Sequence, residues 1–141
     1  MMVNASAVGL RHSLTIQVDD SLTVPRVSPA FGFHDMPPVF ATAYLIGFVE
    51  AACIDALKPH LGDGEKTLGV HVDLSHKAAT PVGMSVTAEV ELVAVEGRRL
   101  RFRVECRDDA DVICVGFHDR YLIDAAKFLE RVKKKQARIS A

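Results

Sequence analysis

Residues 36–57 have the sequence MPPVFATAYLIGFVEAACIDAL, and this stretch decides the fold. From Met36 to Ile54 the only charged residue is Glu50, so the segment is long enough to be considered as a membrane span. A proline pair at its start and a carboxylate inside it, which costs about 2.5–3.5 kcal/mol on insertion, argue against a span. We therefore predict a helix over 39–57 that is buried on nearly all sides in a folded core and ends before Pro59.

The residues before this helix predict a strand and a long loop. Apolar and polar residues alternate from Leu14 to Val18, which indicates a half-buried strand near 12–19. Residues 20–38 hold four prolines and three bulky apolar groups, and a loop this long in a small domain is usually functional, for example as a lid. The three bulky groups are Phe31, Phe33 and Met36.

The residues after the helix predict a sheet and a second helix. Turn residues at 80–83, 96–97 and 108–111 divide the chain into strands, which we expect to form three consecutive antiparallel hairpins. The expected strands are 67–78, 84–96, 99–108 and 112–123. Residues 125–140 predict a short amphipathic helix, with Leu122, Ala126, Leu129 and Val132 near one face.

This order of elements predicts the α+β class and, within it, the hotdog fold: a curved antiparallel sheet wrapped around one long buried helix, with a short C-terminal helix. A chain of 141 residues is the size of one domain, so we expect a single domain over 1–141. A sheet that encloses one helix leaves an exposed edge. We therefore expect a homodimer.

Composition excludes several classes of protein. Seventeen Lys and Arg balance eighteen Asp and Glu, so no overall positive field favours nucleic acid. Three cysteines, too widely spaced for a zinc site and odd in number, predict neither a metal nor a disulfide framework and favour a reducing cytoplasm. The first residues lack the pattern of a secretory leader.

Three residues around the helix are candidates for catalysis. Glu50 has apolar neighbours and no cation within one turn, so its carboxylate either reaches solvent or has a partner from another element. His76 ends the face of its strand that carries Val72 and should lie against the helix, where it is either a core histidine or the partner of Glu50. Thr42 is about 80° from Glu50 around the helix, and is either an ordinary helix-start hydroxyl or part of the same cavity.

Arg120 and the basic run from Lys133 to Arg138 are the candidates for binding anions. The lysine run is typical of a solvated helix end. Arg120 lies on the last strand with His118 on the same face, which favours contact with phosphate or substrate.

From about Phe33 onward the sequence resembles the fluoroacetyl-CoA thioesterase-like family of hotdog proteins. The resemblance is carried by PPVFATAYLIGFVEAAC, by the strand region from TLGVHVDLSHKA to RRLRFRVE, and by GFHDR near the end. It implies an acyl-CoA thioesterase, a hydrolase that works as a homodimer, and we expect no cofactor and no metal.

The resemblance also implies roles for single residues. Thr42, Glu50 and His76 match the catalytic positions, and Gly69 and Arg120 match positions that contact the CoA thioester. Members specialised for fluoroacetyl groups carry an aromatic lid residue where this chain has Met36, whereas Phe33 is kept, so substrate selectivity stays open. Glu50 is the base toward water or the nucleophile. The alternatives are an acyl-CoA binding module without turnover and a hotdog hydratase or dehydratase, for which no Asp–His pair is found on the helix.

Overall fold

The computed structural model describes residues 3–140, with the side chain of Ser140 left out. Five strands and two α-helices make up its regular structure. The strands are β1 (Arg11–Gln17), β2 (Glu65–His76), β3 (Ser85–Glu96), β4 (Arg99–Arg107) and β5 (Val112–Asp124). The helices are α1 (Thr42–Leu57), continued by a 3-10 turn over Lys58–His60, and α2 (Ala125–Ser140). Each predicted element is present, with ends that differ by up to three residues.

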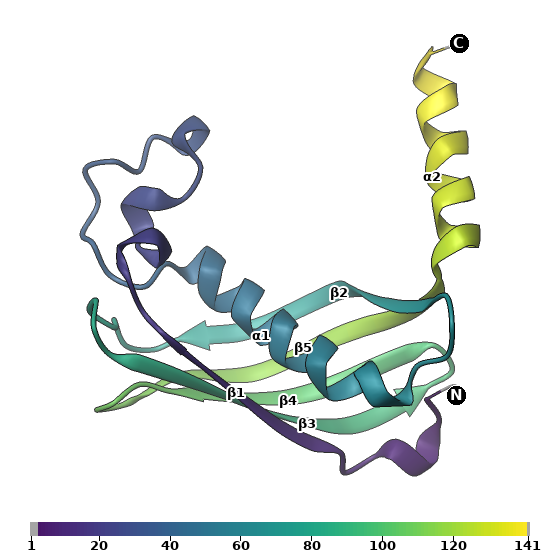
Figure 1. The fold of residues 1–141 in the computed structure, drawn as a ribbon, viewed down its shortest axis with the longest axis horizontal. Helices are drawn as coiled ribbons and strands as arrows, with labels where there is room; N and C mark the ends of the chain where they lie inside the picture. The colour runs from purple at the N-terminus through teal and green to yellow at the C-terminus, as the bar shows by residue number, and fades with distance from the viewer. Residues whose placement is uncertain (1–2, 141) are drawn as a thin grey trace.

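The strands form one antiparallel sheet in the order β1-β3-β4-β5-β2, and α1 lies across one face of it (Figure 1). The hairpins β3–β4 and β4–β5 confirm two of the three predicted hairpins. The third prediction is wrong, because β2 pairs with β5 and not with β3. The segment after β2 crosses the sheet instead, with a bridge between Val39 and Pro81. This crossover leaves β2 as an edge strand.

Helix α1 begins at Thr42, three residues later than predicted, because Val39 and Phe40 are held in β-bridges. Its buried side packs on the inner face of the sheet. That side consists of Leu45, Phe48, Val49, Ala52, Cys53, Ala56 and Leu57. The opposite side is exposed and apolar, with Ile54 at 45% exposure. Burial on nearly all sides is therefore not achieved by one copy of the chain.

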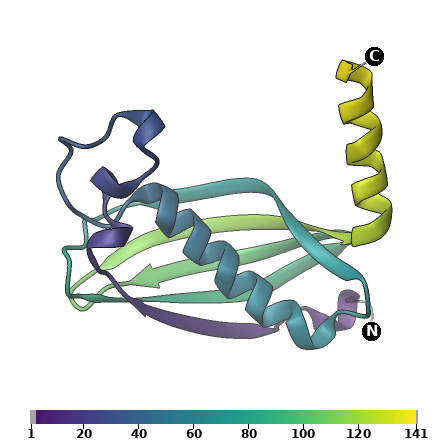
Figure 2. The ribbon, with the colours of Figure 1, turned by 45° about the horizontal axis from the view of Figure 1, so that its top comes forward.

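The loop before α1 and the helix after β5 both stand away from the sheet, at opposite ends of it (Figure 2). The loop contains 3-10 turns at Asp20–Leu22, Val24–Arg26 and Pro29–Phe31. Helix α2 leaves Leu129 and Val132 exposed, so its apolar stripe does not pack on this sheet. Leu122, which we expected on the same stripe, belongs to β5 and is buried in the core instead.

Candidate functional site

Thr42 and His76 form one half of the candidate site. Thr42 is the first residue of α1, and His76 is the last residue of β2. The Thr42 hydroxyl and His76 Nδ1 are 2.8 Å apart and hydrogen-bonded. His76 Nε2 is buried and has no hydrogen-bond partner within residues 3–140. Burial lowers the pKa of His76, which the backbone of Ala78 offsets in part, so the ring favours the neutral form.

Glu50 and Arg120 form the other half. Arg120 Nη1 lies 3.7 Å from Glu50 Oε2, and the guanidinium is almost completely buried whereas the carboxylate is 38% exposed. The sequence offered His76 as the partner of Glu50 from another element, whereas the partner within this chain is Arg120 of β5. No hydrogen bond or ion pair joins Glu50 to His76 within the described chain.

Arg120 is fixed on its other sides by two neighbours. Its Nε donates to the Thr67 hydroxyl at 2.8 Å, and Nη2 donates to the Thr67 carbonyl at 2.9 Å. Nη1 lies 3.1 Å from His118 Nε2, while His118 Nδ1 lies 2.8 Å from the carbonyl oxygen of His71. Because a guanidinium only donates and a carbonyl only accepts, His118 is neutral with its proton on Nδ1. Burial, as the largest cause, also lowers its pKa.

Gly69 lies at the centre of this cluster. A Cβ on it would be 3.0 Å from Glu50 Oε1, 3.1 Å from His118 Cε1 and 3.4 Å from Arg120 Nη1. Gly69 pairs with Arg120, and the register shifts by one residue between Gly69 and His71. This bulge allows both Gly69 and His76 to face α1, although seven residues separate them and strict alternation would put them on opposite faces. Thr67 and His118 belong to the cluster too, and the sequence analysis did not assign them a role.

The two halves are separated within one copy of the chain. Glu50 follows Thr42 by eight residues on α1, a rise of about 12 Å at 1.5 Å per residue. A group of a few atoms therefore does not contact both halves within one copy of the chain.

The loop residues Phe33 and Met36 are exposed, at 38% and 48%. The Phe33 ring packs on Phe31, with 5.8 Å between the ring centroids. Both loop residues therefore present apolar surface to the outside of the chain.

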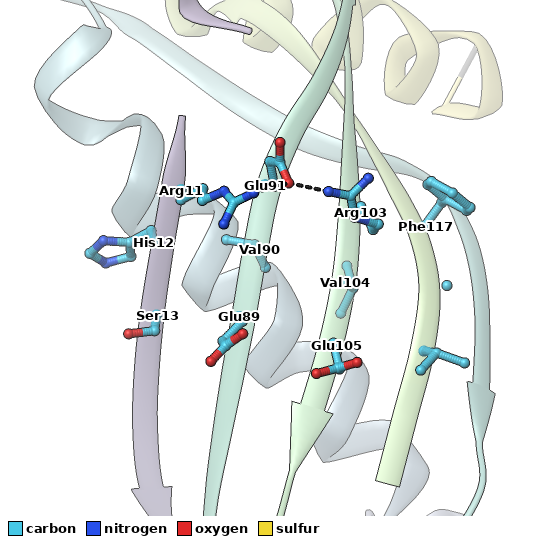
Figure 3. A pocket seen from close by; sticks show the side chains of 12 residues that line it. Arg11, His12, Ser13, Glu89, Val90, Glu91, Arg103, Val104, Glu105 and Phe117 are labelled. Atoms are coloured by element: carbon cyan, nitrogen blue, oxygen red, sulfur yellow. Dashed lines mark hydrogen bonds and ion pairs between the residues drawn. The ribbon is translucent and has the colours of Figure 1, made fainter. Parts of the chain in front are cut away.

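One hollow of the described surface contains none of these residues. It has a volume of about 1000 Å³ and lies on the outer face of the sheet. Helix α1 lies on the opposite face (Figure 3). Glu91 is paired there with Arg11 and Arg103. The charges of Glu91, Arg11 and Arg103 thus satisfy one another, and none of the sequence-predicted site residues lines the hollow. We therefore place the candidate site at the α1–β2–β5 cluster.

No group of three His, Cys, Asp or Glu side chains that would hold a metal ion is found in the described part of the chain. Cys53, Cys106 and Cys114 are buried free thiols. Burial raises the pKa of Cys53 to about 12, so this thiol is not a nucleophile.

Comparison with known proteins identifies the family. The model of the fluoroacetyl-CoA-specific thioesterase family matches residues 18–126. The fluoroacetyl-CoA thioesterase of Streptantibioticus cattleyicolor is 40% identical over 135 residues, which cover 95% of this chain and 97% of that enzyme. This chain belongs to the fluoroacetyl-CoA-specific thioesterase family. As a member of it, the protein is a thioesterase and hence a hydrolase.

Solved structures agree with this family assignment. A fluoroacetyl-CoA thioesterase structure superimposes with a TM-score of 0.88 at 41% identity, over 91% of this chain and 96% of that one. A thioesterase superfamily member from Thermus thermophilus gives 0.82 at 26% identity, over 94% and 95%. A hot-dog-like protein from Thermanaerovibrio acidaminovorans gives 0.78 at 23% identity, over 91% of both chains, and shows the fold alone. The predicted hotdog fold is thereby confirmed.

A membrane span is not found: no α-helix within residues 3–140 is long and apolar enough to cross a bilayer.

Proposed function

We propose that the protein hydrolyses a small acyl-CoA to the free acid and CoA, with Glu50, His76 and Thr42 as the catalytic residues. The observation that carries this proposal is the pair of half-sites: a carboxylate beside a buried arginine, and a histidine fixed by a hydroxyl with its second nitrogen unpartnered. Relatives of the family were crystallised with fluoroacetate and CoA and with acetyl-CoA, which supports a small acyl-CoA as substrate.

Thr42 and His76 lie where they act on the leaving group and on the carbonyl oxygen of the thioester. The hydrogen bond between them fixes the imidazole ring, so Nε2 meets the substrate or a water. Helix α1 begins at Thr42 without a side-chain cap, which leaves amide N–H groups of its first turn to stabilise the oxyanion that forms on the thioester.

Glu50 attacks the thioester carbon or activates the attacking water. As a base it takes a proton from water, whose oxygen bonds to the acyl carbon as the carbon–sulfur bond breaks. As a nucleophile its oxygen forms an anhydride and expels the CoA thiolate, and water then cleaves the anhydride. Arg120 holds the carboxylate on the side of Gly69 in either case, and Gly69, without a side chain, leaves the space that Glu50 Oε1 and the His118 ring occupy.

A homodimer joins the two half-sites. Val70 and Val72 lie on the unpaired edge of β2 and are 49% and 42% exposed. Ile54 on α1 is exposed as well. Two β2 strands that pair antiparallel around Val72 bring His76 of one copy within two residues of Gly69 of the other, on the same face of the sheet. The exposed loop residues Phe33 and Met36 then serve as the lid over the acyl group.

Thiol release from a panel of short acyl-CoAs, fluoroacetyl-CoA and acetyl-CoA included, tests the proposal. Glu50→Gln should lower kcat by about 10² or more with the fold intact, because it removes both basicity and nucleophilicity. Asp55→Asn is the matched control, since Asp55 is an exposed carboxylate of the same helix. It should keep kcat within about threefold.

Three outcomes are informative. Tight binding of acyl-CoA without thiol release would identify a binding module. A folded Glu50→Gln variant with wild-type activity would exclude the mechanism. In labelled water, heavy oxygen in the Glu50 carboxylate after turnover would exclude simple base catalysis and support the anhydride.

A further inference from the structure

The buried side of Arg120 carries an arrangement of hydrogen bonds that the proposed reaction does not yet use. Arg120, His118 and Thr67 are 2%, 1% and 8% exposed, so none of them is free to bind a ligand at the surface. Three of the five N–H groups of Arg120 are taken by Thr67 and His118, at 2.8, 2.9 and 3.1 Å. The remaining hydrogen of Nη1 is the one that faces Glu50 across 3.7 Å.

We propose that Thr67 and His118 are positioning residues that hold the Arg120 guanidinium in the single orientation that places Nη1 beside the Glu50 carboxylate. The inference rests on the proposed function, in which Glu50 is the reacting group. Both residues act through Arg120, and neither touches the substrate.

The arrangement depends on the tautomer of His118. Nε2 accepts from Arg120 only while Nδ1 carries the proton and donates it to the His71 carbonyl. The charged groups near the imidazole are Arg120 and Asp119 on β5 and Glu50 on α1. The neighbouring residues of β4, Leu100 and Phe102, offer no alternative acceptor to the guanidinium.

Two pairs of variants separate positioning from a merely structural role. Thr67→Val removes the hydroxyl acceptor at nearly constant volume, whereas Thr67→Ser keeps it. His118→Asn keeps a donor for the His71 carbonyl and loses the acceptor for Arg120, whereas His118→Gln places an oxygen near the position of Nε2. Since a displacement of about 1 Å can cost about 10² in rate, Thr67→Val and His118→Asn should lower kcat about 10- to 100-fold. KM should stay within about twofold, because neither residue binds substrate.

The conservative variants should restore catalysis. Thr67→Ser and His118→Gln should keep kcat within about fivefold of the wild type. Nitrogen NMR of the wild type should show a neutral His118 protonated on Nδ1, and an Arg120 Nε–H that exchanges slowly with water and becomes fast in Thr67→Val.

Several results would overturn the inference. One is wild-type kcat in Thr67→Val and His118→Asn, with Glu50→Gln inactive. Another is an equal loss in all four variants, which would indicate packing alone, and a third is His118 protonated on Nε2. Wild-type activity in Glu50→Gln would instead refute the proposed function.

Discussion

Gly69→Ala tests the geometry of the candidate site with the smallest possible change. Gly69 does not have a positive φ, so the backbone accepts alanine without strain. The new Cβ lies 3.0 Å from Glu50 Oε1 and 3.1 Å from His118 Cε1, inside normal contact distance. His118 is held by hydrogen bonds on both ring nitrogens, so the partly exposed Glu50 carboxylate is the group that moves.

Both the rate and the stability should fall. With a Cβ at 3.0 Å, the carboxylate oxygen must move by a few tenths of an ångström. Since a displacement of about 1 Å costs about 10² in rate, this smaller shift should lower kcat about 10-fold, or about 1.4 kcal/mol in the activation free energy. Overpacking costs about 1–3 kcal/mol of unfolding free energy, of which the loss of glycine flexibility returns about 0.5–1 kcal/mol. The net loss of stability is therefore about 2.5 kcal/mol or less.

Thiol release at saturating acyl-CoA measures kcat, and urea unfolding measures the stability of the same preparation. Gly47→Ala is the matched control, because Gly47 also has no positive φ and its Cβ would meet nothing within 4 Å. It should gain about 0.5–1 kcal/mol in stability and keep its activity. If Gly69→Ala keeps wild-type kcat and KM, Glu50 is not the reacting group at this position, and the reasoning is refuted.

Three further predictions concern the fold, the histidines and the edge strand. Gly116→Ala should lower the unfolding free energy, measured with urea, by about 3 kcal/mol or more, because Gly116 has a φ of +146° and its Cβ would overlap the Asp73 carbonyl. Unchanged stability would contradict the β2–β5 register. Burial lowers the pKa of His76 and His118, so the unfolded chain binds more protons below about pH 6.5 and unfolding free energy should fall from pH 7 toward pH 5. A flat profile would show that these rings are not buried as neutral groups. Val72→Asp should place two carboxylates together at the proposed two-fold axis and yield monomers of low activity in sedimentation; an active dimer would exclude that axis.

Much of the architecture follows from local pattern. The apolar stretch around Glu50 predicted α1, and period-2 alternation predicted β1, because side-chain burial follows the periodicity of the backbone. Turn residues between the apolar runs predicted the other four strands. The missing cation near Glu50 also suggested a partner from another element, but the candidate was His76, and the partner within this chain is Arg120. One sequence shows that a carboxylate lacks a local counter-ion, but it does not show which distant residue supplies one.

Local sequence pattern did not predict the order of the strands in the sheet. A turn at residues 80–83 has the composition of a hairpin turn, yet β2 lies at the far edge beside β5. The choice of neighbour depends on long-range packing over α1, which no window of residues contains. The exposed side of α1 was missed for a related reason. Composition shows that this side is apolar, but it does not show which part of the protein covers it.

By itself the sequence determined the elements, the hotdog class and the chemically unusual residues, since each of these depends on residue type and spacing. The tertiary structure decided which of those residues meet. Strict alternation places Gly69 and His76 on opposite faces of β2, and only the one-residue bulge between Gly69 and His71 turns both toward α1. Thr42 is therefore bonded to His76 and Glu50 is paired with Arg120, because the bulge and the β2–β5 register, and not residue spacing along the chain, set these contacts.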